Sequence, residues 1–232
     1  MAESVVIVTG GGRGIGRAIA RRFAKAGAQV IAASRNVDDL EETRKEIERD
    51  GGRCLGVPTD VGSADDVSVL IETAAKRFGR VDVLVNNAGV APLCKLEDLD
   101  PDVFRALMSV NVDAVYLGCR AVWPVMRKQS GGAIVNMSSI ASADPFPGFA
   151  AYGASKAWIN AWTKSLAEEG RPFGIRVYAV APGAVETRML RDVFPGFPLD
   201  QALDPMDVAN MVFTLTQPEC VHATGATVFV RK

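Results

Sequence analysis

The sequence contains a single histidine, His222, among its 232 residues. Histidine and cysteine supply most ligands of zinc sites, so this scarcity argues against a metal centre built from histidine clusters. It also argues against a Ser-His-Asp triad, unless His222 itself provides the base. We therefore expect no metal site, and any acid–base chemistry must use another type of side chain.

Cysteine is scarce as well. The sequence has four cysteines, scattered along the chain without a Cys-x-x-Cys spacing: Cys54, Cys94, Cys119 and Cys220. This pattern indicates neither a zinc site nor a disulfide framework.

An excess of one charge and a long apolar run are also missing. The formal net charge is −1, which provides no electrostatic footprint for nucleic acid or an anionic membrane. No apolar run approaches the roughly 20 residues that a transmembrane helix needs. The chain starts with Met-Ala-Glu-Ser and passes directly into apolar residues, without a signal-peptide pattern. We expect a cytoplasmic protein that has neither nucleic acid nor a membrane as its partner.

Short β-branched runs alternate regularly with longer segments of helical periodicity. Strands are expected at residues 5–9, 29–33, 54–58, 81–86, 133–137, 176–181 and 227–230, and helices at 14–26, 37–50, 63–78, 101–128, 152–170 and 205–216. The strands are almost continuously apolar, as in a parallel sheet that is buried on both faces. The alternation predicts an α/β protein: one Rossmann domain over residues 1–232, with a doubly wound seven-stranded parallel sheet and helices on both faces. Residues 186–204, rich in Pro, Phe and Gly, are the expected substrate-loop segment.

A glycine-rich segment, Thr9-Gly-Gly-Gly-Arg-Gly-Ile-Gly16, joins the first expected strand to the first expected helix. Glycines there permit a tight turn and a close approach of the backbone to a phosphate, and a helix N-terminus offers free N–H groups to an anion. A flexible loop is the alternative, but the strand–loop–helix context favours nucleotide binding. The segment lacks a Gly-Lys-Ser/Thr ending, which argues against a nucleoside triphosphatase.

The second expected strand ends at Ala33-Ser34-Arg35, where dinucleotide folds contact the adenosine ribose. An acidic residue there would bind the ribose hydroxyls of NAD, whereas arginine suits the 2′-phosphate of NADP. Ser34 and Arg35 occupy this place, and Arg13 in the glycine loop is a second possible cation. We therefore predict NADP(H) as the cofactor, with NAD(H) as the alternative.

A tyrosine and a lysine stand four residues apart in Tyr152-Gly-Ala-Ser-Lys156, within an expected helix. This spacing places both side chains on one face, about one turn apart. The free pKa of tyrosine is about 10, and a nearby positive charge favours the phenolate and lowers the pKa. The pair can therefore form a tuned proton donor, although two surface residues at this spacing are the plain alternative.

Several further motifs follow in a fixed order along the chain. They are Asp60-Val61 after the third strand, Asn86-Asn87-Ala88-Gly89 after the fourth, then Asn111, Ser139, Tyr152-(x)3-Lys156, and Pro182-Gly183 with Thr187. With the glycine loop before them, these motifs resemble the short-chain dehydrogenase/reductase family, in its 3-oxoacyl-[acyl-carrier-protein] reductase-like branch, from Thr9 to about Val230.

The resemblance implies a catalytic tetrad of Asn111, Ser139, Tyr152 and Lys156. Tyr152 would protonate the substrate oxygen during carbonyl reduction, and Ser139 would hydrogen-bond that oxygen. Lys156 would lower the pKa of Tyr152 and bind the nicotinamide ribose. Asn111 would anchor a water that links Lys156 to solvent. Taken alone, Ser139 reads equally as a helix N-cap and Asn111 as a buried amide bonded to the backbone.

The resemblance also implies which residues contact the cofactor. These are Gly10, Arg13, Gly14, Ile15 and Gly16 at the pyrophosphate, Ser34 and Arg35 at the 2′-phosphate, Asp60 and Val61 at the adenine, Asn87, Ala88 and Gly89 beside the adenosine ribose, Tyr152 and Lys156 at the nicotinamide ribose, and Pro182, Gly183, Val185 and Thr187 at the nicotinamide. For Asn86 a role in holding the sheet together is nearly as well supported as direct binding.

The segment that usually forms the family's substrate lid is short here. Only about 17 residues run from Arg188 to Asp204, so the active site is expected to be relatively open. The apolar residues of this segment and two phenylalanines near Ser139 predict an apolar wall for the substrate, unless they only pack the loop onto the domain. They are Met189, Leu190, Phe194, Phe197 and Leu199, with Phe146 and Phe149.

The family resemblance also implies assembly. We expect a homodimer or homotetramer through the fourth and fifth helices, in which Trp158 and Trp162 are either subunit contacts or intramolecular core. Relatives usually continue past the last strand with an Asp-Gly-Gly tail that joins subunit contacts, and this sequence stops at Lys232, so a tetramer is less supported than a dimer.

The predicted activity is NADP(H)-dependent interconversion of a ketone and a secondary alcohol, on a small and apolar substrate. The alternative is a 3-oxoacyl-[acyl-carrier-protein] reductase of fatty acid synthesis. An acyl carrier protein is acidic and would need a basic rim at the mouth of the site, for which Arg127, Lys128 and Arg171 are candidates, although Glu168 and Glu169 lie beside Arg171. A non-catalytic NADPH sensor is disfavoured because the whole tetrad is present, and a nucleotide-sugar epimerase because such relatives are longer.

Overall fold

The computed structural model describes residues 4–232. Residues 1–3, on which the signal-peptide prediction partly rests, lie outside the described part of the chain. Within residues 4–232, no helix is both long and apolar enough to cross a bilayer.

One sheet of seven parallel strands forms the centre of the molecule, in the order β3-β2-β1-β4-β5-β6-β7. The strands are β1 (Val5–Thr9), β2 (Gln29–Ser34), β3 (Arg53–Pro58), β4 (Val83–Asn86), β5 (Gly132–Met137), β6 (Ile175–Pro182) and β7 (Thr227–Val230). The ranges of β1 and β7 agree with the expected ones, and the other strands differ by one or two residues at their ends. The predicted α/β class and the seven-stranded parallel Rossmann sheet are therefore confirmed.

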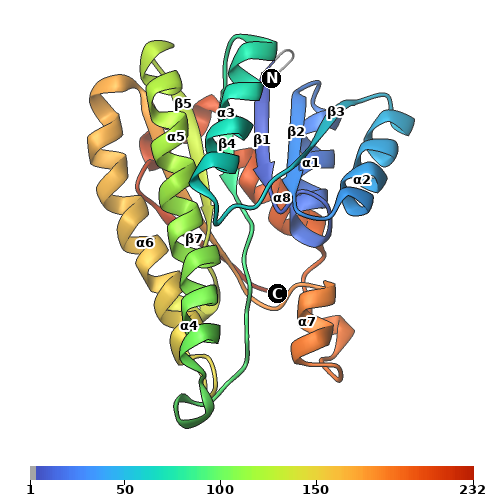
Figure 1. The fold of residues 1–232 in the computed structure, drawn as a ribbon, viewed down its shortest axis with the longest axis vertical. Helices are drawn as coiled ribbons and strands as arrows, with labels where there is room; N and C mark the ends of the chain where they lie inside the picture. The colour runs from blue at the N-terminus through green and yellow to red at the C-terminus, as the bar shows by residue number, and fades with distance from the viewer. Residues whose placement is uncertain (1–3) are drawn as a thin grey trace.

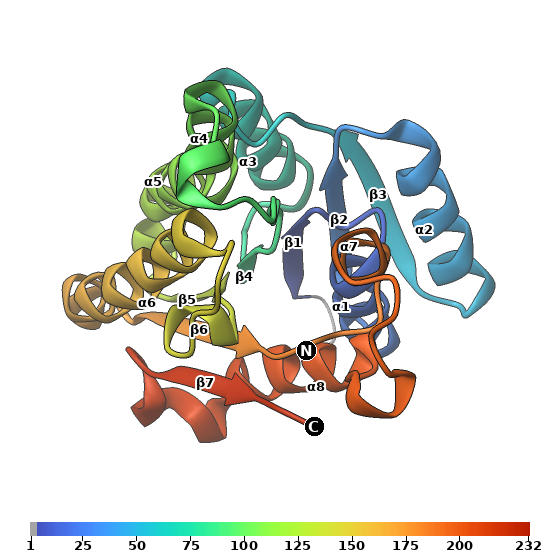
Figure 2. The same ribbon diagram turned by 90° about the horizontal axis from the view of Figure 1, so that it is seen from below.

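Helices cover both faces of the sheet, as Figures 1 and 2 show. The helices are α1 (Gly14–Lys25), α2 (Val37–Arg49), α3 (Ala64–Phe78), α4 (Pro101–Met108), α5 (Ala114–Lys128), α6 (Ala150–Gly170), α7 (Arg188–Val193) and α8 (Pro205–Leu215). In Figure 2, α1, α2 and α8 lie on one side of the sheet and α3, α5 and α6 on the other. Two apolar cores, one on each face, result from this arrangement.

The apolar spacing of α1 explains why it packs as it does. Ile19 and Phe23 recur on one stripe and are fully buried against the sheet and α8. The ring of Phe23 meets that of Phe213 in α8 edge-on, with centroids 5.4 Å apart. This packing fixes the N-terminal end of α1, and with it the glycine loop, at the carboxyl edge of the sheet.

The helix expected at residues 101–128 is present but is not α-helical throughout. Between α4 and α5 the chain forms a π-helical segment, Ser109–Asp113, in which Asn111 lies. The wider π turn admits an extra residue, and such turns recur at functional sites. The apolar spacing of the sequence does not distinguish this segment from ordinary helix.

The expected substrate-loop segment, residues 186–204, contains a short helix of its own, α7. A β-bridge between Val185 and Leu203 joins the two ends of the segment. An ion pair between Arg191 and Glu186 fastens α7 to its own base. The carboxyl ends of the strands point downwards in Figure 1, and α7 lies beyond them. The segment is thus placed over the edge of the sheet where ligands bind in doubly wound folds.

Candidate active site

A cleft of about 450 Å³ lies at the carboxyl ends of the strands. Most of the residues predicted to bind the cofactor line it, although they come from seven separate parts of the chain. The predicted residues along its wall are Gly10, Arg13, Gly14, Ile15, Gly16, Ser34, Arg35, Asp60, Val61, Asn87, Ala88, Gly89, Tyr152, Lys156, Pro182 and Thr187. The fold therefore brings these sequence motifs together in one place.

The glycine loop at one end of the cleft is built for close contact. Gly10 has a φ of +64°, in the left-handed region that favours glycine. A Cβ on Gly16 would lie 2.0 Å from the carbonyl oxygen of Gly10, so no side chain fits there. Asn87 donates from its amide to the carbonyl of Thr9 at 2.9 Å and so ties the loop to the end of β4.

The helix that follows this loop begins without side-chain capping. Arg13 occupies the N-cap of α1 without a capping hydrogen bond among the described residues, and the first turn carries no acidic residue. The first-turn N–H groups of a helix and the positive end of its dipole suit an anion. This end of the cleft therefore fits the pyrophosphate of a dinucleotide.

Ser34, Arg13 and Arg35 gather where the adenosine ribose is expected. Neither arginine forms an ion pair with any residue of the described chain 4–232, so both guanidinium groups are available to a ligand. The structure also places Asp39, from the first turn of α2, on the same wall. Asp39 follows the end of β2 by five residues. It belongs to no recognised motif, so the sequence did not point to it.

Tyr152 and Lys156 stand one helical turn apart near the start of α6, on the cleft wall. The Lys156 Nζ lies 5.8 Å from the centre of the Tyr152 ring. It donates a hydrogen bond to the carbonyl of Met137, at the end of β5, at 2.8 Å. Helix α6 thus carries both side chains, and the sheet edge fixes the position of the ammonium.

Burial governs the protonation behaviour of this pair. Burial raises the pKa of Tyr152, and a hydrogen-bonding interaction with the Ser139 side chain acts in the opposite direction. Burial also lowers the pKa of Lys156, to about 8. Desolvation is the main cause at both groups, and the expected lowering of the Tyr152 pKa by Lys156 stays a prediction.

Ser139 is a buried residue at the end of β5, 8% exposed. Its hydroxyl accepts a hydrogen bond from the N–H of Ala141 at 3.2 Å and caps the short 3₁₀ turn Ile140–Ser142. The capping role considered for this serine is therefore present, and the same hydroxyl lies next to Tyr152. Ser139 itself does not line the cleft, and it reaches the site through its contact with Tyr152, which does.

Asn111 is fully buried, behind the cleft wall. Its amide donates to the carbonyl of Val90 at 2.9 Å and to the hydroxyl of Ser155 at 3.1 Å, and it accepts from the Val90 N–H at 2.9 Å. It thus binds the loop after β4 to α6, next to Lys156. The expected role in anchoring a water stays a prediction.

Some predicted contacts lie away from the cleft wall. The side chain of Val185 is buried in the core, and the N–H of Gly183 bonds to the carbonyl of Val230. Asn86 donates to Asn136 of β5 at 2.9 Å, which is the sheet-holding role rather than binding. The cleft wall also contains residues that sequence analysis did not single out for cofactor contact: Gly12, Asn36, Asp39, Thr59, Val90, Val110, Met137, Ser138, Arg188 and Met189. Thr59, Val90 and Ser138 directly adjoin predicted residues, which is the signal that points to them.

The basic residues considered for a carrier protein lie at the wrong edge of the sheet. Arg127 and Lys128 end α5 just before β5 begins, and Arg171 follows α6 just before β6 begins. In a parallel sheet these positions belong to the amino ends of the strands, opposite the cleft. Arg171 is also paired with Glu168 at 2.7 Å. The prediction of a basic rim at the mouth from these residues is wrong.

A larger hollow, of about 670 Å³, lies between α1, α2 and α8. Its walls include Arg21, Arg22 and Lys25 of α1, but none of the predicted catalytic or cofactor residues. Tyr152 and Lys156 line the smaller cleft, which is therefore the candidate active site.

A comparison with protein families agrees with this geometry. The family described as short chain dehydrogenase matches residues 4–196. The chain belongs to the short-chain dehydrogenase/reductase family. It is therefore an oxidoreductase of the class that acts on ketones and alcohols, and the fit of its cleft to a dinucleotide agrees with the nicotinamide cofactor typical of this family.

Named short-chain dehydrogenases resemble this chain over almost its whole length. Human dehydrogenase/reductase SDR family member 4 is 35% identical, over 99% of this chain and 87% of the relative. The 3beta-hydroxysteroid dehydrogenase 1 of Eggerthella lenta is also 35% identical, over 97% of this chain and 91% of the relative.

Solved structures of short-chain dehydrogenases superpose closely on it. The 3-ketoacyl-(acyl-carrier-protein) reductase of Brucella melitensis, complexed with NADH, has a TM-score of 0.91 at 34% identity and covers 99% of this chain and 97% of its own. A single-residue variant of the actinorhodin polyketide ketoreductase, with NADPH, has a TM-score of 0.94 at 31% identity, with coverages of 100% and 98%. These relatives bind different nicotinamide cofactors, so the fold alone does not decide which one is used.

Proposed function

We propose that this protein is an NADP(H)-dependent oxidoreductase that interconverts a ketone and a secondary alcohol, with NAD(H) as the less favoured cofactor. The observation that carries the proposal is the placement of Tyr152 and Lys156 on one turn of α6, facing a cleft whose other end is a glycine loop. A proton donor and a dinucleotide cradle in one cleft are the two parts that reversible carbonyl reduction requires.

In this proposal the chain's own residues hold the substrate oxygen and move its proton. Tyr152 donates a proton to the oxygen as it becomes an alkoxide, and accepts that proton in the reverse direction. Its raised pKa keeps the phenol protonated at neutral pH, the form that reduction needs. Ser139 hydrogen-bonds the same oxygen, and Asn111 keeps the loop after β4 fixed against α6. The nicotinamide, when bound, supplies the hydride, and Lys156 would bind its ribose.

The preference for NADP(H) rests on two unpaired cations. Arg13 and Arg35 both line the adenosine end of the cleft, and a guanidinium matches a phosphate through two parallel hydrogen bonds. Asp39 on the same wall acts against the 2′-phosphate by repulsion. We infer that the attraction of the 2′-phosphate to two cations exceeds its repulsion by one carboxylate. The protein should therefore bind NADP(H) moderately more tightly than NAD(H).

The substrate side of the site is apolar and aromatic. The ring of Phe149 lies 4.9 Å from that of Tyr152, and the rings of Phe146 and Phe194 lie 4.6 Å and 6.1 Å from Phe149. Phe194 comes from the substrate-loop segment, so this segment packs its aromatic ring towards the catalytic tyrosine. Phe149 is buried, whereas Phe146 and Met189 are 39% and 43% exposed and can still meet a ligand. We infer a substrate with an apolar body next to its carbonyl.

The relatives suggest three kinds of carbonyl for this site: a steroid ketone, a 3-ketoacyl thioester and a polyketide. Free apolar ketones are the favoured class. Thioesters on an acyl carrier protein are second, because the cations considered for carrier docking lie at the far edge of the sheet. A non-catalytic NADPH sensor is third, since the sequence carries all four residues of the expected tetrad.

A substrate panel tests the proposed function. Oxidation of NADPH is followed by its absorbance with cyclic ketones, a 3-ketosteroid, sugars and acetoacetyl thioesters, and each assay is repeated with NADH. We expect turnover of apolar ketones and a lower KM for NADPH than for NADH. Turnover only with NADH would remove the argument from Arg13 and Arg35, and turnover only with carrier-bound thioesters would favour the second candidate.

Replacing the proposed proton donor separates chemistry from cofactor binding. Tyr152→Phe should lower kcat at least a hundredfold, in line with the contribution of a general acid. Its Kd for NADPH, followed by nicotinamide fluorescence, should stay within about threefold of the wild-type value. Tyr116→Phe is the matched control, because Tyr116 lies on α5 and is 41% exposed, away from the cleft. Near-normal turnover by Tyr152→Phe would show that the proton comes from elsewhere.

A further inference from the structure

Two carbonyl groups of the glycine loop, those of Gly11 and Gly12, are directed towards α2. The Gly12 oxygen accepts from the Arg17 guanidinium, with Nε at 3.0 Å and Nη2 at 2.7 Å. The Thr43 hydroxyl, from α2, has one hydrogen to share among three carbonyl oxygens: Gly12 at 3.0 Å, Gly11 at 3.2 Å and Asp39 of its own helix at 3.0 Å. Two successive peptide oxygens therefore lie on the side of the loop that faces α2.

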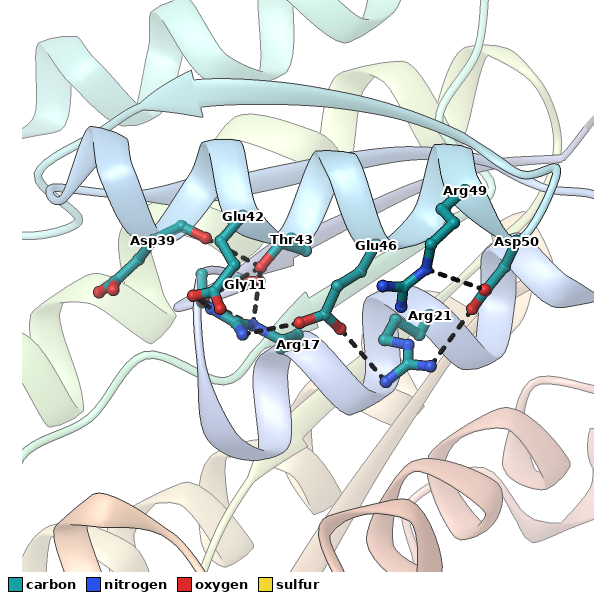
Figure 3. Close-up of polar contacts among 10 residues, drawn as sticks. Gly11, Arg17, Arg21, Asp39, Glu42, Thr43, Glu46, Arg49 and Asp50 are labelled. Carbon is teal, nitrogen blue, oxygen red and sulfur yellow. Dashed lines mark hydrogen bonds and ion pairs between the residues drawn. The ribbon is translucent and has the colours of Figure 1, made fainter.

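Arg17 and Thr43 are firmly fixed behind the loop. The guanidinium of Arg17 also contacts Glu46 at 3.0 Å, Glu42 at 2.7 Å and the Thr43 hydroxyl at 3.1 Å, and its side chain is 19% exposed. Thr43 is fully buried. Figure 3 shows the two side chains between α1 and α2, next to Gly11. A guanidinium with all of these partners cannot easily rotate away from the loop.

The orientation of these oxygens decides where the N–H groups of the loop point. A planar trans peptide holds its C=O and N–H in opposite directions, so an oxygen turned towards α2 turns the N–H of the next residue towards the cleft. The N–H groups concerned are those of Gly12 and Arg13, and neither has an acceptor within residues 4–232. Reversal of either peptide would present a carbonyl oxygen to the pyrophosphate, which is also negative.

We propose that Arg17 and Thr43 are positioning residues for cofactor binding: they hold the Gly11 and Gly12 carbonyls back so that the loop presents N–H groups to the pyrophosphate. This inference rests on the proposed function, because it assumes a dinucleotide in the cleft. Arg17 itself faces α2 and does not line the cleft. It acts only through the loop.

A role limited to holding α1 and α2 together is the competing explanation, and the chain offers a control for it. Arg21 stands one turn further along α1 and also bridges to α2, with Glu46 at 3.2 Å and Asp50 at 3.2 Å. Within the described residues it has no hydrogen bond to the glycine loop. Arg17 and Arg21 thus share the interhelical role and the partner Glu46, and differ in the contact with Gly12.

The experiment measures Kd for NADPH by fluorescence titration, together with KM, kcat and the melting temperature. Arg17→Met and Thr43→Val should each raise Kd and KM about tenfold, while kcat at saturating NADPH falls less than twofold. Arg21→Met should leave the Kd for NADPH within twofold of the wild-type value. Thr43→Ser, which keeps the hydroxyl, should bind NADPH with the wild-type Kd, unlike Thr43→Val. Thr43→Val keeps the shape of the side chain and provides the test if Arg17→Met does not fold.

Two results would overturn the inference. One is a Kd within twofold of wild type for both Arg17→Met and Thr43→Val. The other is an equal loss of affinity in Arg21→Met, which would assign the effect to the contact between the helices. A wild-type protein that binds neither NADPH nor NADH would instead contradict the proposed function, so the two failures are distinguishable.

Discussion

Lys156 is buried and Tyr152 is half-buried, and this burial shifts both groups towards their neutral forms. The pKa of the tyrosine is raised and that of the lysine is lowered to about 8. A lysine with such a pKa exchanges its proton near physiological pH, which suits a group placed behind a proton donor.

The lowered pKa of Lys156 has a consequence for stability. The unfolded chain keeps the lysine proton up to its ordinary pKa of 10.5, whereas the folded chain loses it near pH 8. Between these values the unfolded state binds more protons, so the free energy of unfolding rises with pH. From pH 7.5 to 9.5 the wild-type protein should gain on the order of 1–2 kcal/mol relative to Lys156→Met.

Urea denaturation of both proteins at the two pH values measures this difference. All other titrating groups are common to the two chains, so the comparison isolates Lys156. Parallel changes in the wild type and Lys156→Met would show that the lysine keeps an ordinary pKa.

Asp39 allows a sharp test of cofactor preference. Its carboxylate lies on the wall that also carries Ser34 and Arg35. Asp39→Asn removes a negative charge near the expected 2′-phosphate and should lower KM for NADPH about threefold to tenfold, with little change for NADH. Asp38→Asn, next to it in the first turn of α2 but off the cleft wall, is the control. Equal effects of Asp39→Asn on both cofactors would place the 2′-phosphate elsewhere.

At the scale of elements, α6 and the turn after β5 form one unit. The helix carries Tyr152 and Lys156, and it packs closely on the 3₁₀ turn that Ser139 caps. Gly153 permits this approach, since a Cβ there would lie 2.8 Å from the carbonyl oxygen of Ala141. The distance between the proposed proton donor and the serine therefore depends on a glycine that has no chemical role.

Gly153→Ala should separate these two elements. The added methyl group meets backbone, which cannot swing aside as a side chain can, so we expect a loss of about 1–3 kcal/mol in unfolding free energy. Turnover should fall more than NADPH affinity, because the shift lies between Tyr152 and Ser139. Ala154→Ser, at an exposed position of the same helix, is the control. Chemical denaturation and steady-state kinetics measure both effects, and unchanged kcat in Gly153→Ala would contradict the close fit.

At the scale of the whole molecule, the two edges of the sheet have different roles. The carboxyl edge carries the cleft and the substrate-loop segment, while the cations Arg127, Lys128 and Arg171 lie at the amino edge. The outer surface of α5 and α6 is a third region. There Trp158 and Trp162 stack with centroids 5.1 Å apart, and Tyr116 meets Trp162 at 6.1 Å.

We propose that this surface of α5 and α6 joins two copies of the chain. Tyr116, which belongs to this surface, is 41% exposed, and aromatic residues are enriched in protein interfaces. In sedimentation velocity, Tyr116→Glu should shift a wild-type dimer towards monomer, because it places a charge in the contact. Val69→Glu, at a 57% exposed site on α3, should not. A wild-type protein that is monomeric at micromolar concentration would contradict the proposal.

Sequence alone determined the class of this protein, because local rules suffice for it. Continuous apolar runs predict parallel strands, the loop Thr9–Gly16 predicts a phosphate cradle, and the spacing of Tyr152 and Lys156 places them on one helical face. These signals depend on residues close together in the chain. They identify the family without any knowledge of long-range contacts.

Only the tertiary structure decided the properties that depend on distant segments. It decided which predicted residues share the cleft, and that Asp39 is among them while the side chain of Val185 is not. It also set the pKa shifts of Tyr152 and Lys156, because burial comes from atoms that lie far away in sequence.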